Sequence, residues 1–152
     1  TGNDAAWKAE PTSTVFTHGS GLVNQNTIIM YMWTSIPGYS KIGSYVGNGA
    51  SDGTYVDLGF RPAWLMVKKT SGANSWVLYD VKRSPSNVVD NYLIIEGAQA
   101  ESTNAAVNVD LMSNGFKFLS GYDIVNAGSY IYMAFAEQPA LTTFDQANPN
   151  AR

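Results

Sequence analysis

The stretch SYIYMAFAE, residues Ser129–Glu137, gives the clearest indication of the fold. Consecutive side chains of a strand point to opposite faces, so an extended conformation divides its residues into two sets. One face carries Tyr130, Tyr132, Ala134 and Ala136, and the other carries Ile131, Met133 and Phe135. Both sets are largely apolar, which is typical of a central strand that is covered on both sides.

Similar apolar-rich runs recur along the 152 residues, separated by Gly, Pro, Asn and Ser. They span about five to ten residues, as in an all-β sandwich or barrel, and no window sustains a capped helical stripe. Besides Ser129–Glu137, we expect strands at Thr14–Thr17, Thr27–Ile36, Tyr39–Val46, Thr54–Leu58, Ala63–Thr70, Ser75–Lys82, Tyr92–Ile95, Val107–Met112 and Phe116–Leu119. Many strands without crossover helices build antiparallel layers. The sequence therefore predicts an all-β fold, an antiparallel β-sandwich of the jelly-roll or lectin-like kind.

Turn residues refine this expectation. The pair Asn114-Gly115 is typical of a tight hairpin, and Ser71–Asn74 supplies the loop of a second hairpin. Pro62 should stand at the first residue of a strand or at a bulge, because it cannot donate to a ladder. The ends, about residues 1–12 and 139–152, are polar and extended, and both could wrap a neighbouring subunit. We expect one domain over residues 1–152.

Composition limits the class of partner. Charged residues make up 14% of the chain, against about 25% in ordinary soluble proteins, so the surface must be covered mainly by Ser, Thr, Asn and Gly. The net charge of -3 supplies no cationic surface for a nucleic acid. Cysteine is absent, which excludes disulfides and thiolate zinc sites. No apolar stretch approaches the roughly 20 residues of a membrane span, so we expect no membrane insertion.

The glycine-rich stretch GNGASDG, residues Gly47–Gly53, raises the question of a phosphate or calcium site. A Walker loop ends in Lys-Ser/Thr and opens a helix, whereas here Thr54 begins an apolar strand. A calcium loop needs several oxygen ligands at fixed offsets, and Asp52 is the only charged residue before Asp57. We interpret the stretch as a turn, and we expect neither a metal nor a cofactor.

Catalytic chemistry finds little support. His18 is the only histidine, and it lies in a turn of small residues, where a loop histidine is the simpler interpretation than a catalytic one. Carboxylate pairs for glycoside hydrolysis depend on separations in space, for which the candidates are Asp80, Asp90, Glu96, Glu101, Asp110 and Glu137. We expect no enzyme activity and name no catalytic residue.

The densest polar cluster is YDVKRSPSNVVDNY, which begins at Tyr79. Asp80 and Arg83 could make charge-assisted hydrogen bonds to a sugar while Trp76 or Tyr79 stacks on its ring. The candidate ligand site is Trp76, Asp80 and Arg83. The alternative is an ion pair that pins a loop between two strands. Trp33 and Trp64 are assigned to the core.

Several segments together resemble a known family. In order, these are GYSKIGSYVGNGASDGTYVDLGFRPAWLMVKKT, WVLYDVKRSPSNVVDNYL, VDLMSNGFKF and GSYIYMAFAEQP. They are similar to a domain found at the C-terminal end of tail-fibre and related virion proteins of bacteriophages, particularly marine and cyanobacterial ones. The resemblance covers about Val15 to Pro139.

The resemblance implies a C-terminal module of a longer tail-fibre protein that is located in the virion. It also implies that the module forms a homotrimer and contacts other tail proteins. From this resemblance, the β pattern and the polar, weakly charged surface, we expect the domain to bind a polysaccharide or lipopolysaccharide of the host surface without catalysis. The alternative is a purely structural virion domain that trimerises or caps the fibre or decorates the capsid, and a depolymerase is a third, weaker possibility. Receptor specificity is expected in the loops Ser71–Asn74, Gly97–Asn104 and Gly121–Gly128, since loops vary while strands hold the frame.

Overall fold

A computed structural model of the chain describes residues 12, 15, 17–19 and 31–138. The chain divides into two compact units, Thr1–Trp33 and Thr34–Arg152. In the first unit, Thr12 and Val15 close a short turn in which the Val15 N–H donates to the Thr12 hydroxyl at 2.9 Å. All the strands described below belong to the second unit. The expected single domain over residues 1–152 stays a prediction.

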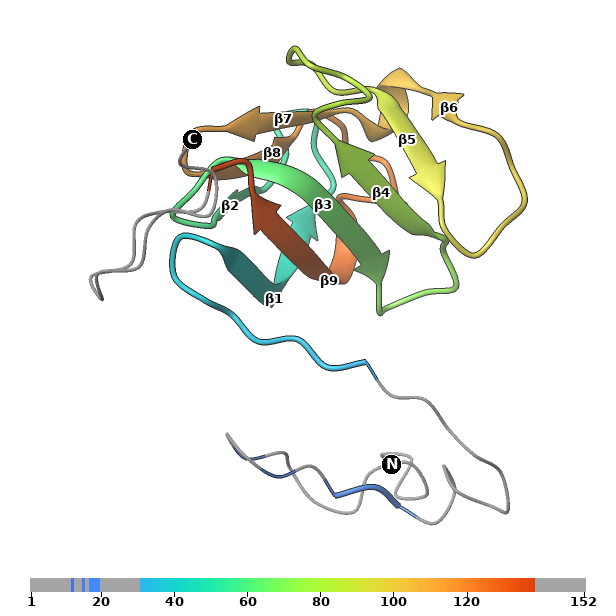
Figure 1. The fold of residues 1–152 in the computed structure, drawn as a ribbon. Helices are drawn as coiled ribbons and strands as arrows, with labels where there is room; N and C mark the ends of the chain where they lie inside the picture. Colours follow the sequence, from blue (N-terminus) through green and yellow to red (C-terminus); the bar gives the residue numbers. More distant parts are fainter. Residues whose placement is uncertain (1–11, 13–14, 16, 20–30, 139–152) are drawn as a thin grey trace. The chain divides into compact units, whose positions relative to one another are not determined.

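The second unit is a sandwich of two antiparallel sheets (Figure 1). The six-stranded sheet has the order β1-β9-β3-β4-β5-β6, and the three-stranded sheet has the order β2-β8-β7. The strands are β1 (Ser40–Asn48), β2 (Tyr55–Asp57), β3 (Pro62–Lys69), β4 (Trp76–Asp80), β5 (Asn91–Ile94), β6 (Ser102–Thr103), β7 (Val109–Met112), β8 (Gly115–Phe118) and β9 (Ala127–Ala136). The predicted antiparallel β-sandwich is confirmed.

Strand β9 is central, because it pairs with β1 on one side and β3 on the other. Its alternation follows the prediction: Tyr130, Tyr132 and Ala134 are buried against the second sheet. The opposite face is only partly covered, and Ile131 is 41% exposed. Ser40 at the start of β1 faces Phe135 near the end of β9, so the chain enters and leaves the sandwich at the same end.

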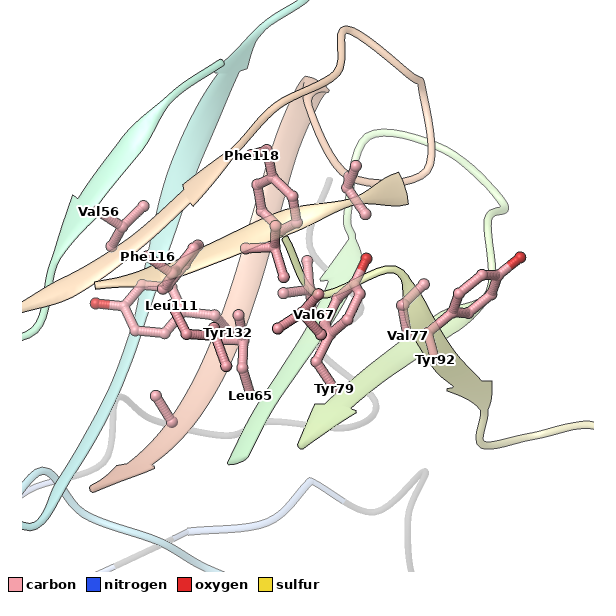
Figure 2. Packing of buried hydrophobic residues seen from close by; sticks show 14 of the residues in the cluster. Val56, Leu65, Val67, Val77, Tyr79, Tyr92, Leu111, Phe116, Phe118 and Tyr132 are labelled. Carbon is pink, nitrogen blue, oxygen red and sulfur yellow. The ribbon is translucent and has the colours of Figure 1, made fainter. Parts of the chain in front are cut away.

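Aromatic rings from both sheets fill the core (Figure 2). The ring of Tyr45 on β1 stacks on Tyr130 with 4.9 Å between centroids and on Phe118 of the other sheet with 5.8 Å. Tyr79 and Phe116 are also fully buried. Burial of each large side chain contributes roughly 1.5–3 kcal/mol, so these rings dominate the packing between the layers.

The segment before β1 differs from the prediction. Residues 31–35 form no strand, and Ile36 makes only an isolated bridge to Ser40. Ile42 lies in β1, at the edge of the sheet. The Ser35 hydroxyl accepts a hydrogen bond from the Ile42 N–H at 3.0 Å and donates one to the Ile42 carbonyl at 3.4 Å. A side chain therefore takes the place of ladder bonds, and the predicted strand Thr27–Ile36 is wrong over its described part. The rest of that strand lies outside the described residues, as do Thr14 and Phe16 of the predicted strand Thr14–Thr17, whose two described residues, Val15 and Thr17, lie in no strand.

Two core assignments also need correction. Trp33 is 55% exposed. Trp64 lies half-buried on the side of β3 that faces away from the second sheet, where it makes an edge contact with Phe135 at 5.5 Å. Two short elements were not predicted, β6 and a 3-10 helix (Ala105–Val107) that the Asn104 side chain caps. Neither is long enough to show a periodicity.

The predicted turns are present with one adjustment. The hairpins β3–β4 and β7–β8 form, and Pro62 is both the first residue of β3 and the site of a bulge. In the second hairpin Met112 pairs with Gly115, so the two loop residues are Ser113 and Asn114. Glycine is needed at 115 because a Cβ there would lie 2.1 Å from the Val56 carbonyl oxygen.

Candidate functional site

The three predicted ligand residues do not form a single patch. Trp76 and Asp80 share the outward face of β4 but lie at its two ends, about 13 Å apart at the rise of a strand. The backbone N–H of Trp76 donates to the Glu96 carboxylate at 3.0 and 3.2 Å. The backbone of Trp76 is therefore tied to Glu96, at the opposite end of β4 from Asp80 and Arg83.

Asp80 and Arg83 do meet, in a network that closes on the protein itself. One carboxylate oxygen of Asp80 accepts the backbone N–H groups of Lys82 and Arg83, both at 2.9 Å, and the other accepts Arg83 Nε at 3.1 Å. The Arg83 guanidinium also pairs with Glu101, and this hydrogen bond is the main cause of its raised pKa. The geometry is that of an ion pair that pins a loop, and the sugar-binding role of these residues stays a prediction.

The glycine-rich stretch is a turn held by a buried amide. Asn126 is fully buried, and its Oδ1 accepts the N–H groups of Asn48 and Thr54 at 3.3 and 3.2 Å. Its Nδ2 donates to Asn48 Oδ1, the Ala50 carbonyl and the Ser120 carbonyl at 2.8, 3.0 and 2.9 Å. The side-chain amide thus joins the loop after β1 to the loop after β8. The interpretation of GNGASDG as a turn is confirmed for Gly49–Gly53, while Gly47 and Asn48 end β1.

The same stretch contributes no group of metal ligands. Asp52 has 88% of its side chain exposed and pairs with Lys117. No cluster of three or more His, Cys, Asp or Glu side chains suited to a metal occurs within the part of the chain that the structure describes. His18 is exposed, with Nδ1 3.3 Å from the Gly19 carbonyl oxygen.

A second polar cluster connects two loops at the end of the sandwich remote from Ser40. The Asp123 carboxylate pairs with Lys69 at the end of β3. Asn74, in the loop between β3 and β4, donates to the Asp123 carboxylate at 2.8 Å and to its backbone carbonyl at 2.9 Å. The Tyr130 hydroxyl donates to the same carbonyl at 2.6 Å. Two loops that are remote in sequence are thereby fixed against each other.

This cluster presents ordered polar groups at the surface. The Lys69 side chain is 9% exposed, whereas the Asp123 side chain is 58% exposed. The hydrogen bond from Lys69, and then that from Asn74, lowers the pKa of Asp123, so its carboxyl group is ionised at neutral pH. An ionised carboxylate offers about four acceptor directions, of which the protein occupies two. The adjacent Tyr122 is 47% exposed, and we call Asn74, Tyr122 and Asp123 the Asp123 patch.

The whole of this region falls within a recognised sequence family. A family model described as a domain of unknown function (DUF7483) matches residues 1–139. The chain belongs to that family. No curated protein and no solved structure matches it. In the described residues of this family member, no helix is long and apolar enough to cross a membrane.

Sequence reasoning located the loops of the Asp123 patch but not its residues. Ser71–Asn74 and Gly121–Gly128 were both expected to carry specificity, and the structure joins them through Asn74 and Asp123. The third loop, Gly97–Asn104, instead supplies Glu101 to the Asp80 network. Asp123 could have been singled out as the only carboxylate in the segment SGYDIVNAG, although its partners are 49 and 54 residues away.

Proposed function

We propose that this domain is the receptor-binding tip of a phage tail fibre and binds a host-surface polysaccharide or lipopolysaccharide without catalysis, through the Asp123 patch. The observation that carries the proposal is the exposed Asp123 carboxylate, which side chains from two other segments hold in place. The resemblance to tail-fibre domains supplies the biological setting.

The chemistry of the patch suits a carbohydrate. A carboxylate with free acceptor directions binds sugar hydroxyl groups through charge-assisted hydrogen bonds, and an exposed tyrosine ring packs against the C–H face of a sugar. Because Lys69 and Asn74 already orient the carboxylate, binding costs little ordering entropy. Asn74 adds an amide group beside these acceptors.

A noncatalytic role agrees with the electrostatics. The described carboxyl groups with a shifted pKa are Asp52, Glu96 and Asp123, and each pKa is lowered. The general acid of a glycosidase needs the opposite shift, so that it keeps its proton at neutral pH.

The position of the patch suits a terminal module. Asn48 at the end of β1 pairs with Ala127 at the start of β9, next to the loop that carries Asp123. Ser40 and Phe135 pair at the opposite end, where the chain enters and leaves. The patch is therefore directed away from the point of attachment.

Binding to a glycan array and to purified host-envelope polysaccharide tests the proposal. Asp123→Asn and Tyr122→Ala should each weaken binding at least tenfold, whereas Asp57→Asn and Tyr55→Ala, exposed on the three-stranded sheet, should not. Circular dichroism checks that each variant is folded. Absence of binding to every host surface fraction by the folded protein would overturn the proposal.

A second candidate is a purely structural virion domain, as the resemblance also allows. The observation that favours it is the partly exposed apolar face of the six-stranded sheet, because a surface of this kind suits subunit packing. If assembled particles lose infectivity when the apolar face is altered but tolerate Asp123→Asn and Tyr122→Ala, the structural role is the better description.

A further inference from the structure

The outward face of the six-stranded sheet carries an uninterrupted apolar row. Register places one residue from each of five neighbouring strands side by side, and none of the five is polar. From β1 to β5 this middle row is Ile42, Met133, Met66, Leu78 and Leu93. The three-stranded sheet packs on the opposite face (Figure 1). Every residue of the row is partly exposed within the described structure.

The rows on either side extend this surface. On one side Ile131, Lys68 and Trp76 are neighbours, and on the other side Phe135, Trp64 and Asp80 are neighbours. At the usual strand spacing and rise, these eleven positions cover roughly 350 Å². This lies within the range for the largest apolar patch of a monomer, about 300–600 Å², and a standard interface buries about 800 Å² on each partner. A partner of the same extent would therefore need contacts along the rim as well.

The two charged side chains in these rows are arranged symmetrically. Lys68 follows Met66 along β3 and lies in the row on one side of the middle row. Asp80 follows Leu78 along the antiparallel strand β4 and lies in the row on the other side. Lys68 Nζ donates to the Lys69 carbonyl at 2.6 Å and, within the described structure, makes no ion pair. Asp80, Arg83 and Glu101 together carry a net charge of -1, from two carboxylates and one guanidinium.

This arrangement is complementary to itself. A two-fold axis that lies in the interface and close to the middle row sets Lys68 of each copy opposite Asp80 of the other, and packs the apolar row on its own equivalent. From strand spacing and rise, the strands of the two sheets then cross at roughly 40°, near the approximately 30° of aligned sheet packing. An interface in which the same patch meets itself is the commonest kind in homo-oligomers.

We propose that the outward face of the six-stranded sheet binds a second copy of this chain, with the middle row at the centre of the interface and Lys68 opposite the Asp80 cluster. This pairing gives assemblies with an even number of copies, in place of the trimer that the resemblance implies. It uses a different surface from the Asp123 patch, so either proposal can fail without the other.

Sedimentation velocity of the full chain over a range of concentrations tests the pairing. The wild type should reach the mass of a dimer or of a multiple of dimers. Met66→Lys places like charges opposite each other across the axis and should weaken association at least 100-fold. The matched control is Met112→Lys, at a 40% exposed position on β7 of the other sheet, which should associate like the wild type. Circular dichroism and Tm show whether both variants are folded.

A charge reversal tests the orientation. Lys68→Glu should weaken association roughly tenfold through two symmetric contacts, with less effect at high salt, while Lys117→Glu on β8 should not. A monomer at every concentration would overturn the proposal, as would a trimer or an assembly insensitive to Met66→Lys. A monomer whose Met66 resists oxidation would show that another segment of the same chain covers the face, which also overturns it.

Discussion

Asn126 and Asp123 lie three residues apart in the segment SGYDIVNAG, yet their side chains differ in burial and in role. Both side chains tie together loops that are distant in sequence. The Asn126 amide is fully buried, and protein groups use all of its hydrogen-bonding atoms. The Asp123 carboxylate is 58% exposed and keeps acceptor directions open to solvent. Burial therefore makes the first a part of the scaffold and leaves the second available to a ligand.

The most severe test of this difference is Asn126→Asp, which keeps the shape and removes the donors. The buried carboxylate would face the Ala50 and Ser120 carbonyl oxygens, and we expect a loss of about 3–5 kcal/mol in the free energy of unfolding. Burial would raise the pKa of the new carboxyl group, so the loss should grow as pH rises above about 4. Urea unfolding measures it. Asn114→Asp in an exposed turn is the control, and an equal effect there would remove the distinction.

Tyr79→Phe tests a buried hydroxyl of the same scaffold. Its hydroxyl donates to the Val107 carbonyl at 2.5 Å, and its loss should cost about 1–2 kcal/mol because the acceptor is left buried and unpaired. Tyr122→Phe, in the exposed patch, should be nearly neutral for stability. Thermal or urea unfolding of the two variants gives the comparison.

The same residue predicts an alkaline effect. Burial raises the pKa of Tyr79 and of Tyr45 well above the usual value. Stability is complete below the unfolded pKa of about 10 and should fall as pH rises further, since the unfolded state loses its tyrosine protons first. Tyr79→Phe should make this decline shallower, and an unchanged slope would contradict the assignment.

Asp123→Asn should change stability less than either substitution in the core. The lowered pKa of Asp123 means that its contribution is present above the unfolded pKa and is lost as pH falls through the lower folded pKa. The Tm of the variant should therefore fall less steeply than that of the wild type as pH is lowered into the acid range. Loss of glycan binding with a small Tm change would separate the exposed group from the scaffold.

Asp52→Ala should have the smallest effect. Asp52 is more exposed than Asp123, and its ion pair with Lys117 lies at the surface, where such pairs contribute little. We expect unchanged glycan binding and a Tm that calcium does not alter. A calcium-dependent Tm in the wild type that disappears in this variant would show that the turn is a metal site.

Short-range patterns in the sequence predicted most of the strands. Alternation in SYIYMAFAE and the turn residues around it are local, and the corresponding strand and hairpins are present. The error at residues 31–35 has a different origin, because the apolar pattern there is strong but the edge of β1 is occupied by the Ser35 hydroxyl. The competition between a side chain and a neighbouring strand for one backbone edge cannot be read from periodicity.

The candidate site was predictable only in part for the same reason. Asp80 and Arg83 are three residues apart and were recognised as an ion-pair candidate. Asp123 and Asn126 sit in similar polar surroundings in the sequence, and contacts up to 78 residues away decide that only one of them is buried. Sequence reasoning could place specificity in two loops, and the fold was needed to choose the residues.

The pairing of β1 with β9 has a mechanical consequence. If a load acts between the Asp123 patch and Ser40, it runs along β1, so the ladder to β9 is sheared and its hydrogen bonds must give way together. If instead the load acts between Ser40 and Ala136, it pulls neighbouring strand ends apart and opens the same ladder one pair at a time. A domain that is attached at Ser40 and binds its ligand through the Asp123 patch is loaded in the shearing direction. It should therefore resist unfolding by force better than its small size suggests.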